Sequence, residues 1–71
     1  MDKYELAGKI VLAPSPGKMM KQIREERGIG QGELAKKLGV KQSTLSDYEA
    51  GRRGSPGTAV VKRFVQKITE G

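Results

Sequence analysis

The segment from Gln31 to Glu49 limits the possible folds more than any other part of the chain. Ala35 is a small residue at the point where two short helices would approach each other most closely. Gly39 tolerates the positive φ that a tight turn between such helices requires. Val40 and Leu45 are apolar and would fill the wedge between the helices. The spacing therefore predicts two helices that cross steeply, with the second one protruding from the domain.

Caps and apolar spacing predict three further helices. The tripeptide Ser-Pro-Gly occurs twice, and Ser15 and Ser55 are each expected to be an N-cap followed by Pro at the first helical position. Asp2 is a third candidate N-cap. The run from Ile10 to Leu12 also fits a short strand, but no partner strand is visible elsewhere. The predicted helices span residues 3–12, 16–27, 31–38, 42–50 and 56–69.

Five short helices in 71 residues predict an all-α fold, a compact bundle that forms a single domain over residues 1–71, with its core motif at 17–53. The last helix has an apolar face wide enough to exceed what so small a core can cover. The residues expected to face the core are Leu6, Ile10, Met19, Met20, Ile23, Arg27, Ile29, Leu34, Ala35, Leu38, Val40, Leu45, Tyr48, Val60, Val61, Phe64, Val65 and Ile68.

The charge of the chain indicates an anionic partner. Lys and Arg total 14 against 8 acidic residues, which gives a net charge of +6 and a pI near 9.9. Nucleic acid is the first partner to consider and an anionic membrane surface the second, while simple solubility is the third explanation. No apolar run approaches the roughly 20 residues that span a bilayer, and the charged amino terminus does not resemble a secretory signal. A cytoplasmic location is therefore expected.

Composition also argues against catalysis. The chain has no Cys and no His, so neither a disulfide framework nor a usual zinc site is available. No acidic cluster has the spacing of a metal site. The glycine-rich stretch 28–32 lacks the preceding strand and the Gly-Lys-Ser/Thr ending of a phosphate loop. The sequence predicts no enzyme, no metal, no cofactor and no evident small-molecule site.

Two linked motifs carry a family resemblance. The pattern Gln-x-Glu-Leu-Ala-x-x-Leu-Gly-Val, followed by Ser-Thr-Leu-Ser-x-Tyr-Glu-x-Gly, resembles the lambdoid phage Cro and repressor helix-turn-helix domains and their wider xenobiotic-response-element-like group. The resemblance extends from about Gly17 to Phe64 and implies a lambda-repressor-like DNA-binding fold. The stretches 5–12 and 46–49 also resemble the first domain of larger archaeal transcription regulators.

The resemblance implies which residues contact DNA. Gln42 matches a glutamine that makes a paired contact with adenine, and an amide can donate to N7 and accept from N6. Asp47 could accept from cytosine N4 or repel the wrong site. The implied base-reading residues are Lys41, Gln42, Ser43 and Asp47, and the implied phosphate contacts are Gln31, Thr44, Arg52 and Arg53. Gln31 is also expected to brace the reading helix. The alternative is that these polar residues form an ordinary solvated surface.

The resemblance further implies a buried ion pair between Arg24 and Glu49. Losing one partner of such a pair costs on the order of 3–5 kcal/mol. Three residues depart from the family pattern: Gly30 replaces the usual side-chain cap, Gly32 weakens the first helical turn, and Ala50 replaces an Asn that contacts phosphate.

Two functions of different classes follow. The first is sequence-specific binding of double-stranded DNA by a transcription regulator acting as a homodimer. The second is a protein-interaction module, similar to bridging factors or antitoxins, that uses the apolar face of the last helix with Val61 and Val65. The same face could also form a dimer contact or a seam to another domain. Steep salt dependence on DNA would distinguish the first function from the second.

Overall fold

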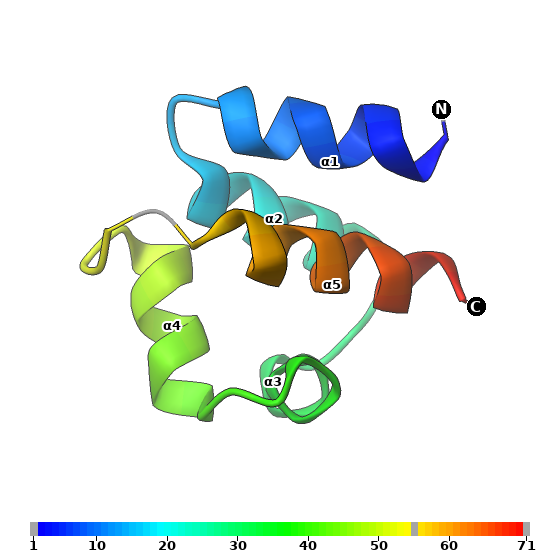
Figure 1. Ribbon diagram of the computed structural model, residues 1–71. Helices are drawn as coiled ribbons and strands as arrows, with labels where there is room; N and C mark the ends of the chain where they lie inside the picture. Colours follow the sequence, from blue (N-terminus) through cyan, green and yellow to red (C-terminus); the bar gives the residue numbers. More distant parts are fainter. Residues whose placement is uncertain (1, 55, 71) are drawn as a thin grey trace.

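Five α-helices and no strand make up the computed structural model, which describes residues 2–54 and 56–70 (Figure 1). This confirms the all-α prediction. In chain order the helices are α1 (Lys3–Leu12), α2 (Pro16–Glu26), α3 (Gln31–Leu38), α4 (Gln42–Ala50) and α5 (Thr58–Thr69).

The helix ends largely follow the predicted caps and stops. The Asp2 carboxylate caps α1 by accepting a hydrogen bond from the backbone N–H of Glu5 at 2.9 Å. Gly39 adopts a φ of 72° and ends α3, as the turn requires. The prediction for α5 is wrong at its start, since the helix begins at Thr58 with Gly57 as its N-cap. Pro56 is buried before the helix instead of opening it. The predicted cap Ser55 lies outside the described residues.

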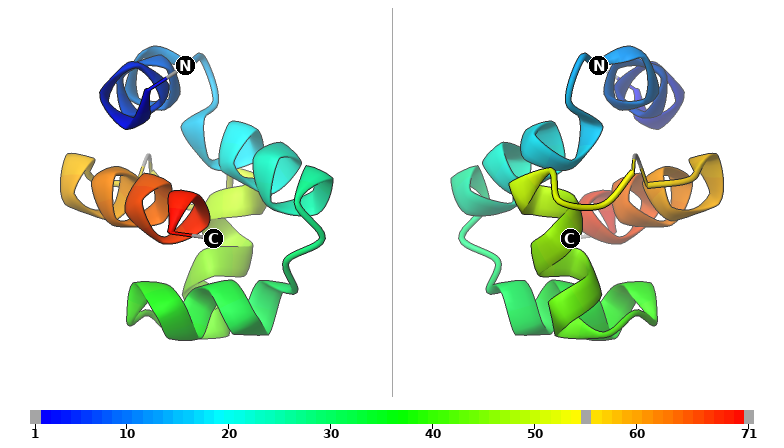
Figure 2. Two further views of the ribbon diagram at one scale, coloured as in Figure 1. Left: turned by 90° about the vertical axis from the view of Figure 1, so that its right-hand side faces the viewer. Right: turned by 90° about the vertical axis from the view of Figure 1, so that its left-hand side faces the viewer.

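The core lies between α5 and the other helices, and α1 covers part of it. Figures 1 and 2 show α1 lying alongside α5 on the side away from α3. Val61 and Val65 are 0% and 2% exposed. The expectation that the apolar face of α5 exceeds the core is therefore wrong, because α1 supplies the extra cover. The buried apolar side chains are Ile10, Met20, Leu34, Ala35, Leu38, Leu45, Val61, Phe64, Val65 and Ile68.

This burial also corrects the alternative function. The interaction-module hypothesis placed a docking surface on α5 at Val61 and Val65. Val61 is fully buried, and Val65 keeps only 2% exposure at the wall of a groove between α1 and α5, so the two side chains do not form an open docking face. The same reasoning removes these residues as a dimer contact or a domain seam.

The core face of α2 differs from its prediction by one turn. Met20 is buried, but Arg27 is exposed at the C-cap and Arg24 is buried in its place. Arg24 follows Met20 by four residues and so lies on the same helix face. Gly17 allows the start of α2 to touch α4, because a Cβ at this position would overlap the backbone carbonyl of Tyr48. Tyr48 itself is half-buried.

No helix in the described residues is both long and apolar enough to cross a membrane.

Candidate nucleic-acid interface

The pair formed by α3 and α4 has the steep crossing that the sequence predicts. Figure 1 views α3 nearly along its axis, whereas α4 lies close to the plane of the page, and Figure 2 agrees with this arrangement. Ala35 is 2% exposed, and its carbonyl accepts a hydrogen bond from the N–H of Val40 at 3.1 Å. Leu45 is fully buried behind the turn. The amino-terminal end of α4 is consequently presented at the surface.

We call this surface the reading edge and define it as Gln31 together with residues 41–44. Lys41, Gln42 and Ser43 are exposed, and Thr44 is half-buried. These residues were predicted to contact bases or phosphate, and the fold places them together at the adjoining amino-terminal ends of α3 and α4. Backbone N–H groups at such helix ends favour negatively charged groups.

A buried ion pair joins α2 to the far end of α4. The Arg24 Nε donates to Glu49 Oε2 at 2.8 Å, and the Arg24 Nη2 donates to Glu49 Oε1 at 3.1 Å. The remaining Arg24 Nη1 donates to the carbonyl of Ile29 at 2.8 Å. The pair expected from the sequence is therefore present, in the bidentate form that is stronger than a single contact.

Arg24 keeps its positive charge near neutral pH. The hydrogen bond to Glu49 raises the pKa of Arg24, burial opposes this rise, and the negative charges of Glu49 and Glu25 reinforce it. Because the pKa of Arg24 is higher in the folded state than in the unfolded state, its charge stabilises the fold. This contribution is complete at any pH below the unfolded-state pKa. That stability is lost only as pH rises through the raised pKa of Arg24, so the contribution of the guanidinium does not change near neutral pH.

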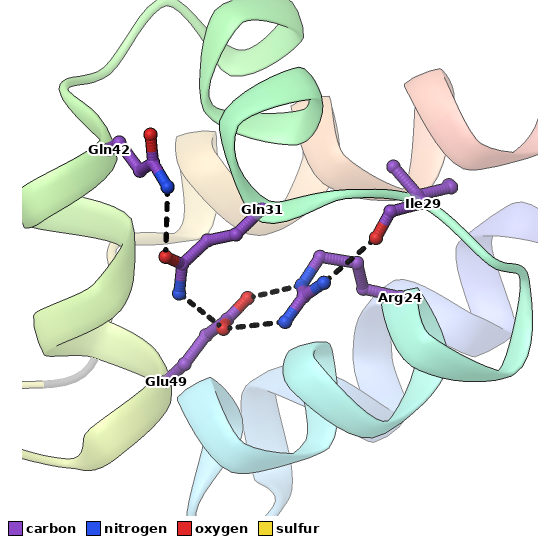
Figure 3. A network of polar contacts seen from close by, with 5 residues as sticks. All are labelled: Arg24, Ile29, Gln31, Gln42 and Glu49. Atoms are coloured by element: carbon purple, nitrogen blue, oxygen red, sulfur yellow. Dashed lines mark hydrogen bonds and ion pairs between the residues drawn. The ribbon is translucent and has the colours of Figure 1, made fainter.

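Gln31 extends the ion pair to the reading edge (Figure 3). Its Nε2 donates to Glu49 Oε1 at 3.0 Å, and its Oε1 accepts from the Nε2 of Gln42 at 3.3 Å. Figure 3 shows the Oε1 of Gln42 pointing away from Gln31. We call this chain of contacts, from Arg24 through Glu49 and Gln31 to Gln42, the relay. It fixes one amide N–H of Gln42 and leaves the Oε1 and the second N–H without a partner among the described residues. These are the acceptor and donor that an adenine edge requires.

Gly32 provides the space in which the Gln42 amide lies. A Cβ at Gly32 would stand 3.1 Å from Gln42 Oε1 and 3.5 Å from its Cδ. Sequence reasoning treated Gly32 as a weak point of the helix and missed this contact. The available signal was a glycine in the first turn of a helix, where it carries a cost in stability and calls for a compensating role.

Asp47 and Arg52 are paired with each other, which the sequence did not predict. The Arg52 Nε donates to Asp47 Oδ1 at 3.0 Å, and its Nη2 donates to Ser46 Oγ at 3.4 Å. The two side chains of the ion pair are 62% and 39% exposed, so the pair contributes less than about 1 kcal/mol and can open at low cost. The Arg53 guanidinium lies over the ring of Tyr48 at 5.8 Å.

The described residues hold no group of three or more acidic side chains that could bind a metal ion.

Comparison with known proteins places these features in a family. The HTH_3 family, described as helix-turn-helix, matches residues 20–68. An HTH-type transcriptional regulator of Methanocaldococcus jannaschii is 46% identical over 65 residues, and one of Archaeoglobus fulgidus is 43% identical over 65. These matches cover 92% of this chain but only 27% and 28% of the two archaeal proteins. The chain thus spans about a quarter of their length.

A shorter match involves the antitoxin HipB of Escherichia coli K12, which is 53% identical over 30 residues, or 42% of this chain and 34% of the antitoxin. No solved structure matches the chain significantly. The archaeal matches leave six of the 71 residues uncovered, so they include at least part of α1, whereas the family match begins after it.

Proposed function

Because the chain belongs to the HTH_3 helix-turn-helix family, we propose that it binds double-stranded DNA sequence-specifically as a transcription regulator and reads the major groove with the start of α4. The observation that carries this proposal is the relay from the Arg24–Glu49 pair through Gln31 to Gln42. A base-reading amide gains specificity when its orientation is fixed before DNA binds, and three successive contacts fix this one.

The proposed base contacts are made from one short stretch of α4. Gln42 binds adenine through its free Oε1 and N–H, and the exposed Lys41 and Ser43 flank it. Asp47 discriminates between sites, because its carboxylate repels DNA wherever no donor such as cytosine N4 faces it. The guanidinium of Arg52, which shares that carboxylate, reduces the repulsion.

Phosphate contacts supply most of the affinity. We assign them to Gln31, Thr44, Arg52 and Arg53, whose side chains flank the base-reading residues along the chain. The net charge of +6 makes counterion release a large part of binding, so affinity falls steeply as salt rises. Ala50 offers no side-chain donor at the end of α4, which removes one backbone contact that phage repressors make.

Two copies of the domain are proposed to act together on a two-fold operator in the cytoplasm. Half-sites one helical turn apart are separated by roughly 34 Å. The domain measures 29 × 26 × 20 Å, so two copies fit side by side on one face of the duplex. The role requires no catalytic chemistry and no cofactor.

The test is selection of bound DNA from random duplexes, followed by titration of the selected operator and its single-base variants. Gln42→Ala should lose about 1–3 kcal/mol of binding free energy at one base position. Arg53→Ala should weaken all sequences alike and reduce the salt slope by about one. Lys9→Ala, which removes the same charge from α1, is the matched control. Equal losses on every sequence for Gln42→Ala would contradict its base-reading role.

A further inference from the structure

A second surface lies between α1 and α5, away from the reading edge. It is an open groove of about 540 Å³ with Val65 among the residues of its wall. Three large hydrophobic side chains are exposed among the described residues: Tyr4 at 78%, Val11 at 41% and Leu12 at 85%. All three line this groove. Apolar side chains that gather at one concave surface, rather than being scattered singly, mark a contact site.

The charges of the groove have one sign. Lys3 and Lys62 are the charged residues that line it, one from each helix, and no carboxylate is among the lining residues. Electrostatic complementarity therefore favours an occupant that carries acidic groups beside an apolar surface. A second copy of the domain is disfavoured, because a two-fold contact would bring four lysines together on chains that each carry a net charge of +6.

The shape of the groove fits a helix. It is partly open to solvent, and its lining residues all belong to α1 and α5, which lie side by side (Figure 2). An amphipathic helix binds such a groove with one apolar stripe. We propose that this groove docks an acidic amphipathic helix of a partner protein, with its apolar stripe against Tyr4, Val11 and Leu12 and its carboxylates beside Lys3 and Lys62.

The position of the groove leaves DNA access open. Figure 1 places α1 at the top of the molecule, with α3 and the start of α4 at the bottom. The partner helix can therefore bind with or without DNA, and this proposal does not depend on the DNA-binding one. The wall formed by α1 lies outside the family match but partly inside the archaeal matches, which identifies the groove as an addition to the common helix-turn-helix unit.

Two synthetic helical peptides of about 16 residues test the proposal. Both carry the same leucine stripe, but one has Glu and the other Lys at the flanking positions. Fluorescence anisotropy measures their affinities for the domain, and NMR shift changes locate the site. The Glu peptide should bind the groove at least about tenfold more tightly than the Lys peptide. Lys62→Glu should remove that preference, while Lys9→Glu, the same change on α1 outside the groove, should reduce it far less.

Leu12→Ser should weaken the Glu peptide about tenfold or more. Leu12 is 85% exposed, so the variant should keep its melting temperature and its DNA affinity. Equal binding of both peptides, or of neither, would overturn the proposal. Self-association of the domain that is abolished by Leu12→Ser would also overturn it, because the occupant would then be a second copy.

Discussion

Substitutions at Glu49 separate the contribution of the buried relay to stability from its contribution to the proposed DNA reading. Glu49 is 3% exposed and accepts three hydrogen bonds, two from Arg24 and one from Gln31. The Glu49→Gln substitution keeps the size of the side chain but removes its charge, and it leaves the Arg24 guanidinium, 10% exposed, without its hydrogen-bonded carboxylate. Such a loss costs about 3–5 kcal/mol. A domain of 71 residues has a total stability of roughly 4–10 kcal/mol, so Glu49→Gln should be near its unfolding limit.

The double variant Arg24→Met/Glu49→Leu should recover most of that stability. Replacing a buried ion pair with apolar side chains of similar size is often neutral or stabilising. The carbonyl of Ile29 loses its donor, so recovery should fall short by about 1 kcal/mol. DNA reading should not recover, because Gln31 no longer has the acceptor that holds it toward Gln42.

Urea denaturation gives the free energies of unfolding, and anisotropy titrations of the selected operator at one fixed salt concentration give the affinities. The double variant should be within about 1–2 kcal/mol of the wild type in stability but at least tenfold weaker on the operator. Wild-type DNA affinity in a stable double variant would refute the proposal that the relay orients Gln42 for DNA binding. A loss below 1 kcal/mol in Glu49→Gln would refute the energetic reasoning.

Three other substitutions follow from the contacts around the reading edge. Asp47→Ala releases Arg52 and removes a negative charge, so affinity for unrelated DNA should rise and the ratio of operator affinity to unrelated-DNA affinity should shrink. An unchanged ratio in competition titrations would exclude a discriminating role. Gly32→Ala should add up to about 1 kcal/mol of stability but weaken operator binding, because the new methyl group crowds the Gln42 amide. The control Gly8→Ala, with nothing within 4 Å of its Cβ, should stabilise the domain without changing its DNA affinity. Gly17→Ala should lower stability by roughly 1–3 kcal/mol or more through overlap with α4, and an unchanged thermal midpoint would show that α2 can shift freely.

The parts of the fold that the sequence predicted best depend on local chemistry. Gly39 and Gly51 end α3 and α4 because a residue without a Cβ, which tolerates positive φ, follows each apolar repeat. The start of α5 was missed because a Ser-Pro-Gly signal allows more than one helix start, and the burial of Pro56 decides between them. The Arg24–Glu49 pair is separated by 25 residues and was predicted only through the family resemblance.

Periodicity and residue spacing alone did not predict which side chains and helices contact one another. Periodicity shows that α5 has a wide apolar face, but it does not show that α1 folds back over it. Nor does spacing reveal that Arg52 turns back to Asp47, because an exposed arginine can reach many partners at similar energy. The role of Gly32 was not predictable for the same reason, because it depends on where the Gln42 amide lies.

The position of α1 also limits how two copies of the domain can cooperate on DNA. Covering Val61 and Val65 uses the largest apolar surface of α5 for the stability of one domain, and the groove that α1 creates is lined by lysines that repel a second copy. If two copies occupy half-sites about 34 Å apart, as proposed, domains whose longest extent is 29 Å leave no room for a wide contact between them. The isolated domain gains little from pairing directly with itself. Under the proposed function, strong binding then requires a high local concentration of two domains.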